Sequence, residues 1–176
     1  AYQDYGKRGK YENAFSGTNG YYAGAWAEEN FKPKYDIILD GAYSGSKIFW
    51  FNGIKDIQAV FEKQGIVFDT TKNEQFSQSF SFSSSARWGV INFANAKNTL
   101  LAFGSAACRT IEKLIVSENT PFDQTFGSCN ALENLTIEGT IGQNGFNVSW
   151  SPLNKSSLTS VVNALSSTTT GLTVTL

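Results

Sequence analysis

Two glutamates, Glu112 and Glu133, occupy matching places in two similar segments of the chain. Glu112 directly follows Ile111, Glu133 directly follows Leu132, and each of these apolar residues opens the same spacing of later apolar residues. If the segments lie side by side in register, the two carboxylates stack, and Lys113 could offset their repulsion. Such a pair could bind a cation or serve a retaining glycosidase, whose carboxyl groups lie about 5–5.5 Å apart in a cleft. Nothing in the sequence marks a cleft, so we favour a solvated outer face.

Two cysteines, Cys108 and Cys129, also match in position. Stacked segments would bring their Cα atoms to about 4.8 Å, which a disulfide can span, but parallel side-chain directions make that bond awkward. We therefore predict two buried thiols that pack as small apolar side chains. The chain has no histidine, which leaves few ligands for a metal and excludes a Ser-His-Asp triad. We predict no catalytic residue, no metal and no cofactor, and hence a protein that is not an enzyme.

The four tryptophans are the other residues with binding chemistry. Trp88 lies within an apolar pattern and is expected in the core. Trp26 and Trp50 lie in less regular stretches, where an exposed indole could stack on a sugar ring, although most tryptophan side chains are buried. The candidate ligand-contact residues are therefore Trp26, Trp50, Glu112 and Glu133.

The composition limits the class of protein. At 176 residues the chain fits one domain, and its net charge of −1 with 16% charged residues offers no basic patch for nucleic acid. It has no run of about 18 consecutive apolar residues, so we expect no membrane insertion. The sequence starts without methionine or an apolar signal region, which we interpret as a piece processed from a longer protein. Abundant Ser, Thr, Asn and Gly favour a loop-rich β architecture and an extracellular or virion setting.

The elements that would position these residues recur along the chain. Residues 126–137 contain a pattern formed by Phe126, Cys129, Leu132, Leu135 and Ile137. The part of this pattern that begins at the cysteine also occurs 21 residues earlier, starting at Cys108. Ile54 and Ile57 show the same three-residue apolar spacing, which we interpret as another repeat. Other candidate strands are residues 35–39, 66–68 and 88–93, and turn residues follow each one. Such a period predicts a solenoid. The aromatic side chains expected to fill its interior from the opposite side are Phe76, Phe80, Phe103, Phe122 and Phe126.

The two ends of the chain depart from this pattern. Residues 1–34 are irregular and aromatic, which indicates a cap over the open end of the solenoid or, alternatively, a platform of exposed aromatic rings. Near the other end, alternating apolar residues within 141–150 suggest one more strand. Ser156 or Ser157 could then cap a helix, whose apolar face would comprise Leu158, Val161, Val162 and Leu165. The strict alternation of residues 172–176 predicts a closing strand.

The spacing F-x-x-C-x-x-L-x-x-[LI]-x-[IL] resembles the BspA-like (treponemal-type) leucine-rich repeats of bacterial surface proteins and of related proteins in phages of gut bacteria. Residues 126–137 fit it fully, the segment around Cys108 fits with an insertion, and residues 11–15, 31–35 and 135–176 resemble flanking segments of such proteins. The resemblance implies a β-rich α+β fold, a short leucine-rich-repeat-like solenoid in a single domain, 1–176. Its parts would be an irregular aromatic N-terminal cap at 1–34, repeats at 35–153, and a helix-plus-strand C-terminal cap at 154–176.

The resemblance also implies a function. We expect a non-catalytic, surface-exposed recognition or adhesion module of a bacterial surface or phage particle, whose partner is a host-surface protein or glycan. An alternative is a structural module of a phage tail or other assembly, which contacts neighbouring subunits. A third alternative is a glycan-active enzyme that uses pairs of acidic residues.

Overall fold

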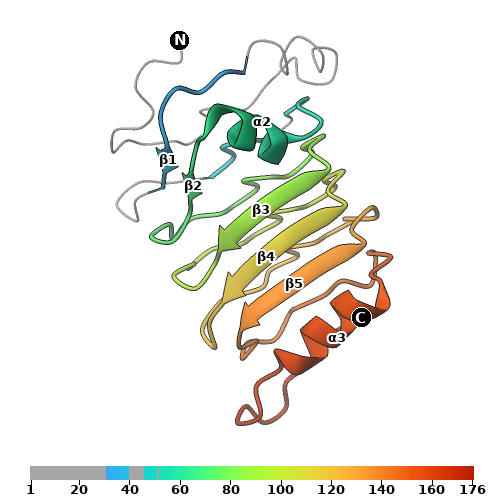
Figure 1. Ribbon diagram of the computed structural model, residues 1–176. Coiled ribbons are helices and arrows are strands. Elements are labelled where there is room, and N and C mark those ends of the chain that lie inside the picture. Colours follow the sequence, from blue (N-terminus) through green and yellow to red (C-terminus); the bar gives the residue numbers. More distant parts are fainter. Residues whose placement is uncertain (1–30, 40–45, 51) are drawn as a thin grey trace.

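Two parallel sheets and two helices make up the regular structure of residues 31–39, 46–50 and 52–176, which the computed structural model describes. The strands β1 (Ile37–Ile38) and β2 (Phe68–Asp69) form the smaller sheet, with the helix α2 (Ile57–Gln64) between them in sequence. The larger sheet holds β3 (Arg87–Asn92), β4 (Thr110–Val116) and β5 (Asn134–Gly139) in that order. The helix α3 (Lys155–Asn163) follows and lies beside β5 (Figure 1).

The predicted short leucine-rich-repeat solenoid with its two caps is wrong. Over the described residues the strands form two separate small sheets, of two and three strands, with two helices and no solenoid. One physical reason is the segment around Ile54 and Ile57, whose apolar spacing we interpreted as another repeat. Capping interactions make that segment the start of a helix instead. The proposed division into residues 1–34, 35–153 and 154–176 stays a prediction.

The helix α2 was missed although the sequence carries its signals. The Asp56 carboxylate accepts a hydrogen bond from the Ala59 N–H at 2.8 Å, which caps the N-terminus. Gly65 ends the helix in the left-handed conformation, with φ of 64°. Ile57 and Phe61 are one helical turn apart and both buried, so an apolar face fixes the helix against the core.

The register between β4 and β5 differs from the alignment that we used. Trp88 pairs with Ile111, and Ile111 pairs with Leu135, so Leu132 does not match Ile111. The backbone N–H of Glu133 donates to the Arg109 carbonyl before β5 begins. The two glutamates and the two cysteines that we treated as equivalent are therefore not in equivalent positions.

Stacked phenylalanines fill the space behind the larger sheet, as predicted. The ring of Phe103 lies 4.7 Å from Phe80 and 5.7 Å from Phe126, with interplanar angles of 24° and 6°. Backbone hydrogen bonds hold these turns at a common spacing, from the Phe80 N–H to the Ala102 carbonyl and from the Phe103 N–H to the Thr125 carbonyl, both 2.8 Å. The predicted interior residues, all buried, are Phe76, Phe80, Phe103, Phe122 and Phe126, and Trp88 is buried beside them.

The C-terminal helix was predicted, but its boundary and role are different. Its N-cap is Asn154, not Ser156 or Ser157. Ser157 and Ser160 instead accept hydrogen bonds from the backbone N–H groups of Leu135 and Ile137, both at 2.8 Å. These bonds occupy donors at the open edge of β5, which would otherwise be available to another strand.

The two further strands predicted near the C-terminus are wrong. Residues 141–150 and 172–176 make only isolated bridges, Ile141 with Leu165 and Asn147 with Thr175. Neither range forms a strand with continuous pairing. Trp150, which we counted in that alternation, is 65% exposed. Val162, predicted on the apolar face of α3, is also exposed. Among the described helices none is long and apolar enough to cross a membrane.

Candidate functional site

The predicted ligand-contact residues that the structure describes do not come together. Trp26 lies outside the described residues. Trp50 is half-buried, and the Lys47 ammonium lies 5.2 Å from the centre of its ring, so a cation occupies a place where a sugar could stack. Glu133 is exposed directly before β5, whereas Glu112 faces an arginine on β3. Trp50, Glu112 and Glu133, the three that the structure describes, therefore form no shared site.

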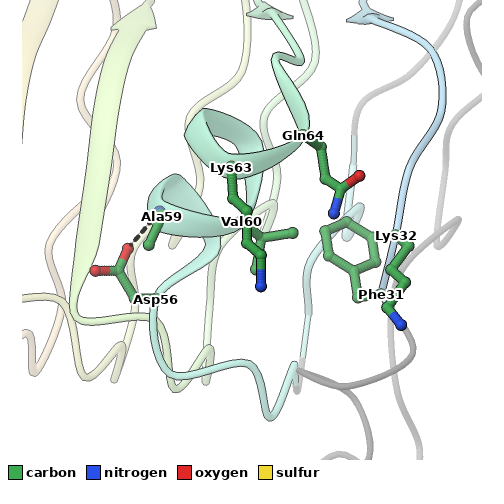
Figure 2. Close-up of a pocket in the computed structure, with 7 residues that line it drawn as sticks. All are labelled: Phe31, Lys32, Asp56, Ala59, Val60, Lys63 and Gln64. Atoms are coloured by element: carbon green, nitrogen blue, oxygen red, sulfur yellow. Dashed lines mark hydrogen bonds between the residues drawn. The ribbon is translucent and has the colours of Figure 1, made fainter.

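An open pocket lies instead between residues 31–34 and α2. Its volume is about 290 Å³. Figure 2 shows Val60 and Gln64 extending from α2 toward the ring of Phe31, with Lys32 and Lys63 on either side. Residues three and four positions apart on α2 share this side of the helix because a turn takes about 3.6 residues. The full lining is Phe31, Lys32, Asp56, Ala59, Val60, Lys63 and Gln64.

The charge of this pocket is positive and uncompensated. Lys32 and Lys63 are exposed, and neither has an ion-pair partner among the residues that the structure describes. The one acidic side chain of the lining, Asp56, is already engaged, since one oxygen caps α2 and the other lies 3.4 Å from Arg87. Two ammonium groups beside an apolar floor provide attraction for an anion that also carries an apolar group.

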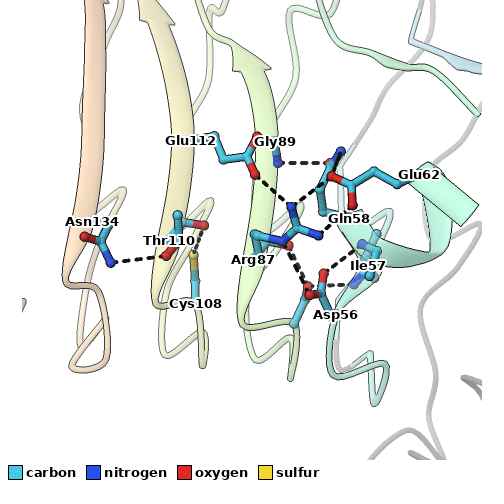
Figure 3. Close-up of polar contacts among 12 residues, drawn as sticks. Asp56, Ile57, Gln58, Glu62, Arg87, Gly89, Cys108, Thr110, Glu112 and Asn134 are labelled. Atoms are coloured by element: carbon cyan, nitrogen blue, oxygen red, sulfur yellow. Dashed lines mark hydrogen bonds and ion pairs between the residues drawn. The ribbon is translucent and has the colours of Figure 1, made fainter.

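Three carboxylates converge on Arg87, next to this pocket. The guanidinium binds Glu62 through two hydrogen bonds of 2.8 Å and Glu112 through one of 2.9 Å, and it lies 3.4 Å from Asp56 (Figure 3). The partners come from α2 and β4, so a single arginine on β3 joins the helix to the sheet. The hydrogen bond from Arg87 lowers the pKa of Glu62. The same hydrogen bond is the main cause of the raised pKa of Arg87.

This arrangement is the opposite of what a glycosidase acid needs. A general acid has a pKa raised toward neutrality, whereas Arg87 holds the pKa of Glu62 below its ordinary value. The Glu112 carboxylate is bound to the same guanidinium. The convergence of carboxylates therefore has a structural explanation, which is to fix α2 to β3 and β4. Within the described residues, no three acidic, cysteine or histidine side chains are grouped to hold a metal ion.

Replacing Arg87 by glutamine is expected to destabilise the fold by about 1–2 kcal/mol at pH 7, because three carboxylates lose their common partner. The folded pKa of Glu62 is depressed, so its contribution is present above the unfolded value near 4.5 and is lost as the pH falls through the folded value. The difference between wild type and Arg87→Gln should therefore shrink on acidification. Urea unfolding from pH 7 to about pH 3 measures this difference.

The matched control is Arg109→Gln, since Arg109 is exposed and has no ion pair among the described residues. We expect it to change the free energy of unfolding by less than about 0.5 kcal/mol at every pH. Equal losses in both variants, or a loss in Arg87→Gln that grows on acidification, would contradict the role given to Arg87.

The cysteines confirm the prediction of buried thiols. Cys108 and Cys129 are both buried and free. Burial raises the pKa of Cys108 and raises that of Cys129 to about 12, so neither forms a thiolate at neutral pH. The Cys108 thiol donates to the Thr110 carbonyl at 3.4 Å (Figure 3), which places it in the packing beneath β4.

Comparison with known proteins does not assign the chain to a family: no family model, no curated protein and no solved structure matches it. The resemblance to BspA-like surface proteins therefore stays a prediction. The pocket beside α2 was also missed from the sequence. The signal that could have found it is the helix itself, because recognising the caps at Asp56 and Gly65 places Val60, Lys63 and Gln64 on neighbouring positions of one surface.

Proposed function

We propose that this chain is a non-catalytic recognition module that binds an acidic, partly apolar segment of a partner protein in the pocket beside α2. The observation that carries the proposal is the pair of exposed lysines, Lys32 and Lys63, which border the apolar side chains of Phe31 and Val60 without ion-pair partners in the described part of the chain. A carboxylate between the two ammonium groups would be attracted by both. An apolar side chain beside that carboxylate would cover Ala59 and Val60.

The lining favours a peptide over a sugar. Ala59, Val60 and Phe31 provide a mainly apolar floor, and the Asp56 carboxylate is occupied by the α2 backbone and Arg87. Apart from the two lysines, Gln64 supplies the remaining side-chain polar group. A sugar carries hydroxyl groups on most of its ring, and most of these would find no partner here. A leucine or phenylalanine next to a glutamate or aspartate suits the same surface.

Two observations support recognition over the alternatives of the sequence analysis. The acidic residues that converge, Glu62 and Glu112, are bound to Arg87, which disfavours their use as a glycosidase pair. The open edge of β5 is engaged by Ser157 and Ser160 of α3, which disfavours assembly with neighbouring subunits by strand addition. Display on a bacterial surface or phage particle completes the proposal and follows from the composition and the resemblance.

A charge-reversal experiment tests the proposal. An array of peptides with Glu or Asp flanked by Leu, Phe or Val is screened with wild type, and the tightest peptide is titrated by calorimetry. We expect Lys32→Glu/Lys63→Glu to weaken binding at least tenfold, which is about 1.4 kcal/mol. Raising the ionic strength from about 0.1 M to about 1 M should weaken wild-type binding, because the Debye length falls from about 10 Å to about 3 Å.

The control is Lys72→Glu/Lys155→Glu, which makes the same change of net charge at two exposed lysines outside the pocket lining. It should leave the affinity within about twofold of wild type, apart from a weak long-range effect. If no acidic peptide binds, or if both double variants lose affinity equally, the proposed pocket is wrong. Concentration-dependent assembly of the wild-type chain, with no peptide binding, would favour the structural module.

A further inference from the structure

An asparagine followed by a glycine, Asn144-Gly145, forms an exposed turn far from the pocket beside α2 in the sequence. Both residues are exposed. A second such pair, Asn52-Gly53, is buried, and a third, at residues 19–20, lies outside the described residues. The backbone nitrogen that follows an asparagine can attack its side-chain amide, and glycine obstructs this attack least because it has no side chain.

The fold requires glycine at position 145. Its φ is 94°, which disfavours any residue with a side chain. An added Cβ would also overlap the backbone carbonyl oxygen of Phe122. The Gly145 N–H has no hydrogen-bond partner among the described residues. The structure therefore keeps an unhindered and unpaired backbone nitrogen directly after Asn144.

The side-chain carbonyl of Asn144 is polarised by a backbone donor. Its Oδ1 accepts a hydrogen bond from the Thr173 N–H at 2.7 Å. Attack on Cγ moves electrons onto this oxygen, and a donor that already points at it stabilises the developing negative charge. The Oδ1 of Asn52 also accepts from a backbone N–H, that of Ile54 at 2.8 Å. The main difference between the two sites is therefore burial, which keeps water from Asn52.

We infer that Asn144 is a site of self-modification, at which the folded chain releases the side-chain amide as ammonia. The Gly145 nitrogen forms a bond to Asn144 Cγ, the Cγ–Nδ2 bond breaks, and the leaving amide takes the proton of the Gly145 N–H. The resulting five-membered imide contains atoms of these two residues alone, so covalent connectivity supplies the proximity. Water then opens the ring at either carbonyl, which gives aspartate or isoaspartate with one added negative charge.

The two products act differently on residues 172–176. Aspartate keeps the length of the backbone, and its carboxylate accepts the Thr173 N–H in a stronger, charge-assisted hydrogen bond. Isoaspartate carries the chain through its side chain and so inserts one more backbone atom before Gly145. The close fit of Gly145 against Phe122 leaves no space for this atom, so we expect the isoaspartyl form to be less stable. The inference does not depend on the peptide pocket.

The test is peptide mapping by mass spectrometry of the full chain during incubation at mildly alkaline pH, with fragmentation to assign each mass change to a residue. In the folded chain, Asn144 should gain about 1 Da, at a rate at least about tenfold above that of Asn52. In concentrated urea, which exposes both pairs, the two rates should agree within about threefold. Asn144→Gln should abolish the change at this position, because glutamine would have to close a larger ring.

Asn147 is the control within the same chain, because it is as exposed in class as Asn144 but precedes Val148, whose branched side chain obstructs the attack. It should keep its amide throughout. The isoaspartyl fraction, separated by chromatography, should melt at a lower temperature than the unmodified chain. The inference is overturned if Asn144 reacts in urea but not in the folded chain, if Asn52 or Asn147 reacts as fast as Asn144 in the folded chain, or if the isoaspartyl and unmodified chains melt together.

Discussion

Replacing Phe103 by alanine is expected to lower the free energy of unfolding by about 3–5 kcal/mol. Phe103 is fully buried, and its ring stacks between those of Phe80 and Phe126 at 4.7 Å and 5.7 Å. Truncation removes its apolar surface from the core and leaves a cavity, because the backbone of the neighbouring turns is fixed by hydrogen bonds and cannot close over the space. The loss of both ring contacts adds to this effect.

Equilibrium unfolding in urea measures this loss. Trp150→Ala is the control, since it also removes a large aromatic side chain, but from a site that is 65% exposed. We expect Trp150→Ala to cost less than about 0.5 kcal/mol. A cost below about 1 kcal/mol for Phe103→Ala would mean that the stacked rings do not support the fold.

Replacing Gly139 by alanine is expected to have the next largest effect, a loss of about 2–5 kcal/mol. Gly139 ends β5 with φ of 103°, a conformation that costs an L-residue about 1–2 kcal/mol or more. An added Cβ would also overlap the backbone carbonyl oxygen of Val116 on β4. That oxygen belongs to the paired strand and cannot rotate away as a side chain would, so overpacking adds about 1–3 kcal/mol.

Gly171→Ala separates these two causes. Gly171 also has a positive φ, of 73°, but no atom lies within 4 Å of the added Cβ. Thermal and urea unfolding should therefore show only the conformational cost, about 1–2 kcal/mol. If the two alanine variants are equally stable, the close approach of β4 and β5 at Gly139 is not a constraint on the fold.

The sequence was sufficient to predict which residues form the core and where most of the strands lie. Apolar residues at strand spacing placed Trp88, Ile111 and Leu135 on the buried side, and all three are buried. Burial is encoded residue by residue, so it survives an error in the overall architecture. The phenylalanines of the interior were found for the same reason.

The register and the helix α2 were not found, because they depend on interactions between distant segments and on caps. The cysteines suggested a period of 21 residues, but the pairing of Ile111 with Leu135 and a shift in register before Leu114 set the real alignment. At α2, the cap residues Asp56 and Gly65 outweighed the apolar spacing that we had interpreted as a repeat. Both errors came from treating one spacing of apolar residues as evidence for a continuous series of repeats.

The candidate site was harder still, because it consists of exposed residues with no motif. Lys32 and Lys63 are 31 positions apart in the sequence, and they border one pocket because α2 lies against residues 31–34. Glu112 was singled out by its position as a candidate ligand-contact residue, yet its partner Arg87 gives it a structural role. Such pairings depend on the tertiary structure, which a periodic pattern of apolar residues does not specify.

The central claim is that an acidic peptide segment binds between residues 31–34 and α2. The most direct measurement is a titration of the full ¹⁵N-labelled chain with the tightest acidic peptide from the array. We predict saturable shifts of the amide signals of Lys32, Ala59, Val60 and Gln64, and the loss of those shifts in Lys32→Glu/Lys63→Glu. Shifts confined to the strands β3 to β5, or no shifts at any peptide concentration, would contradict the claim.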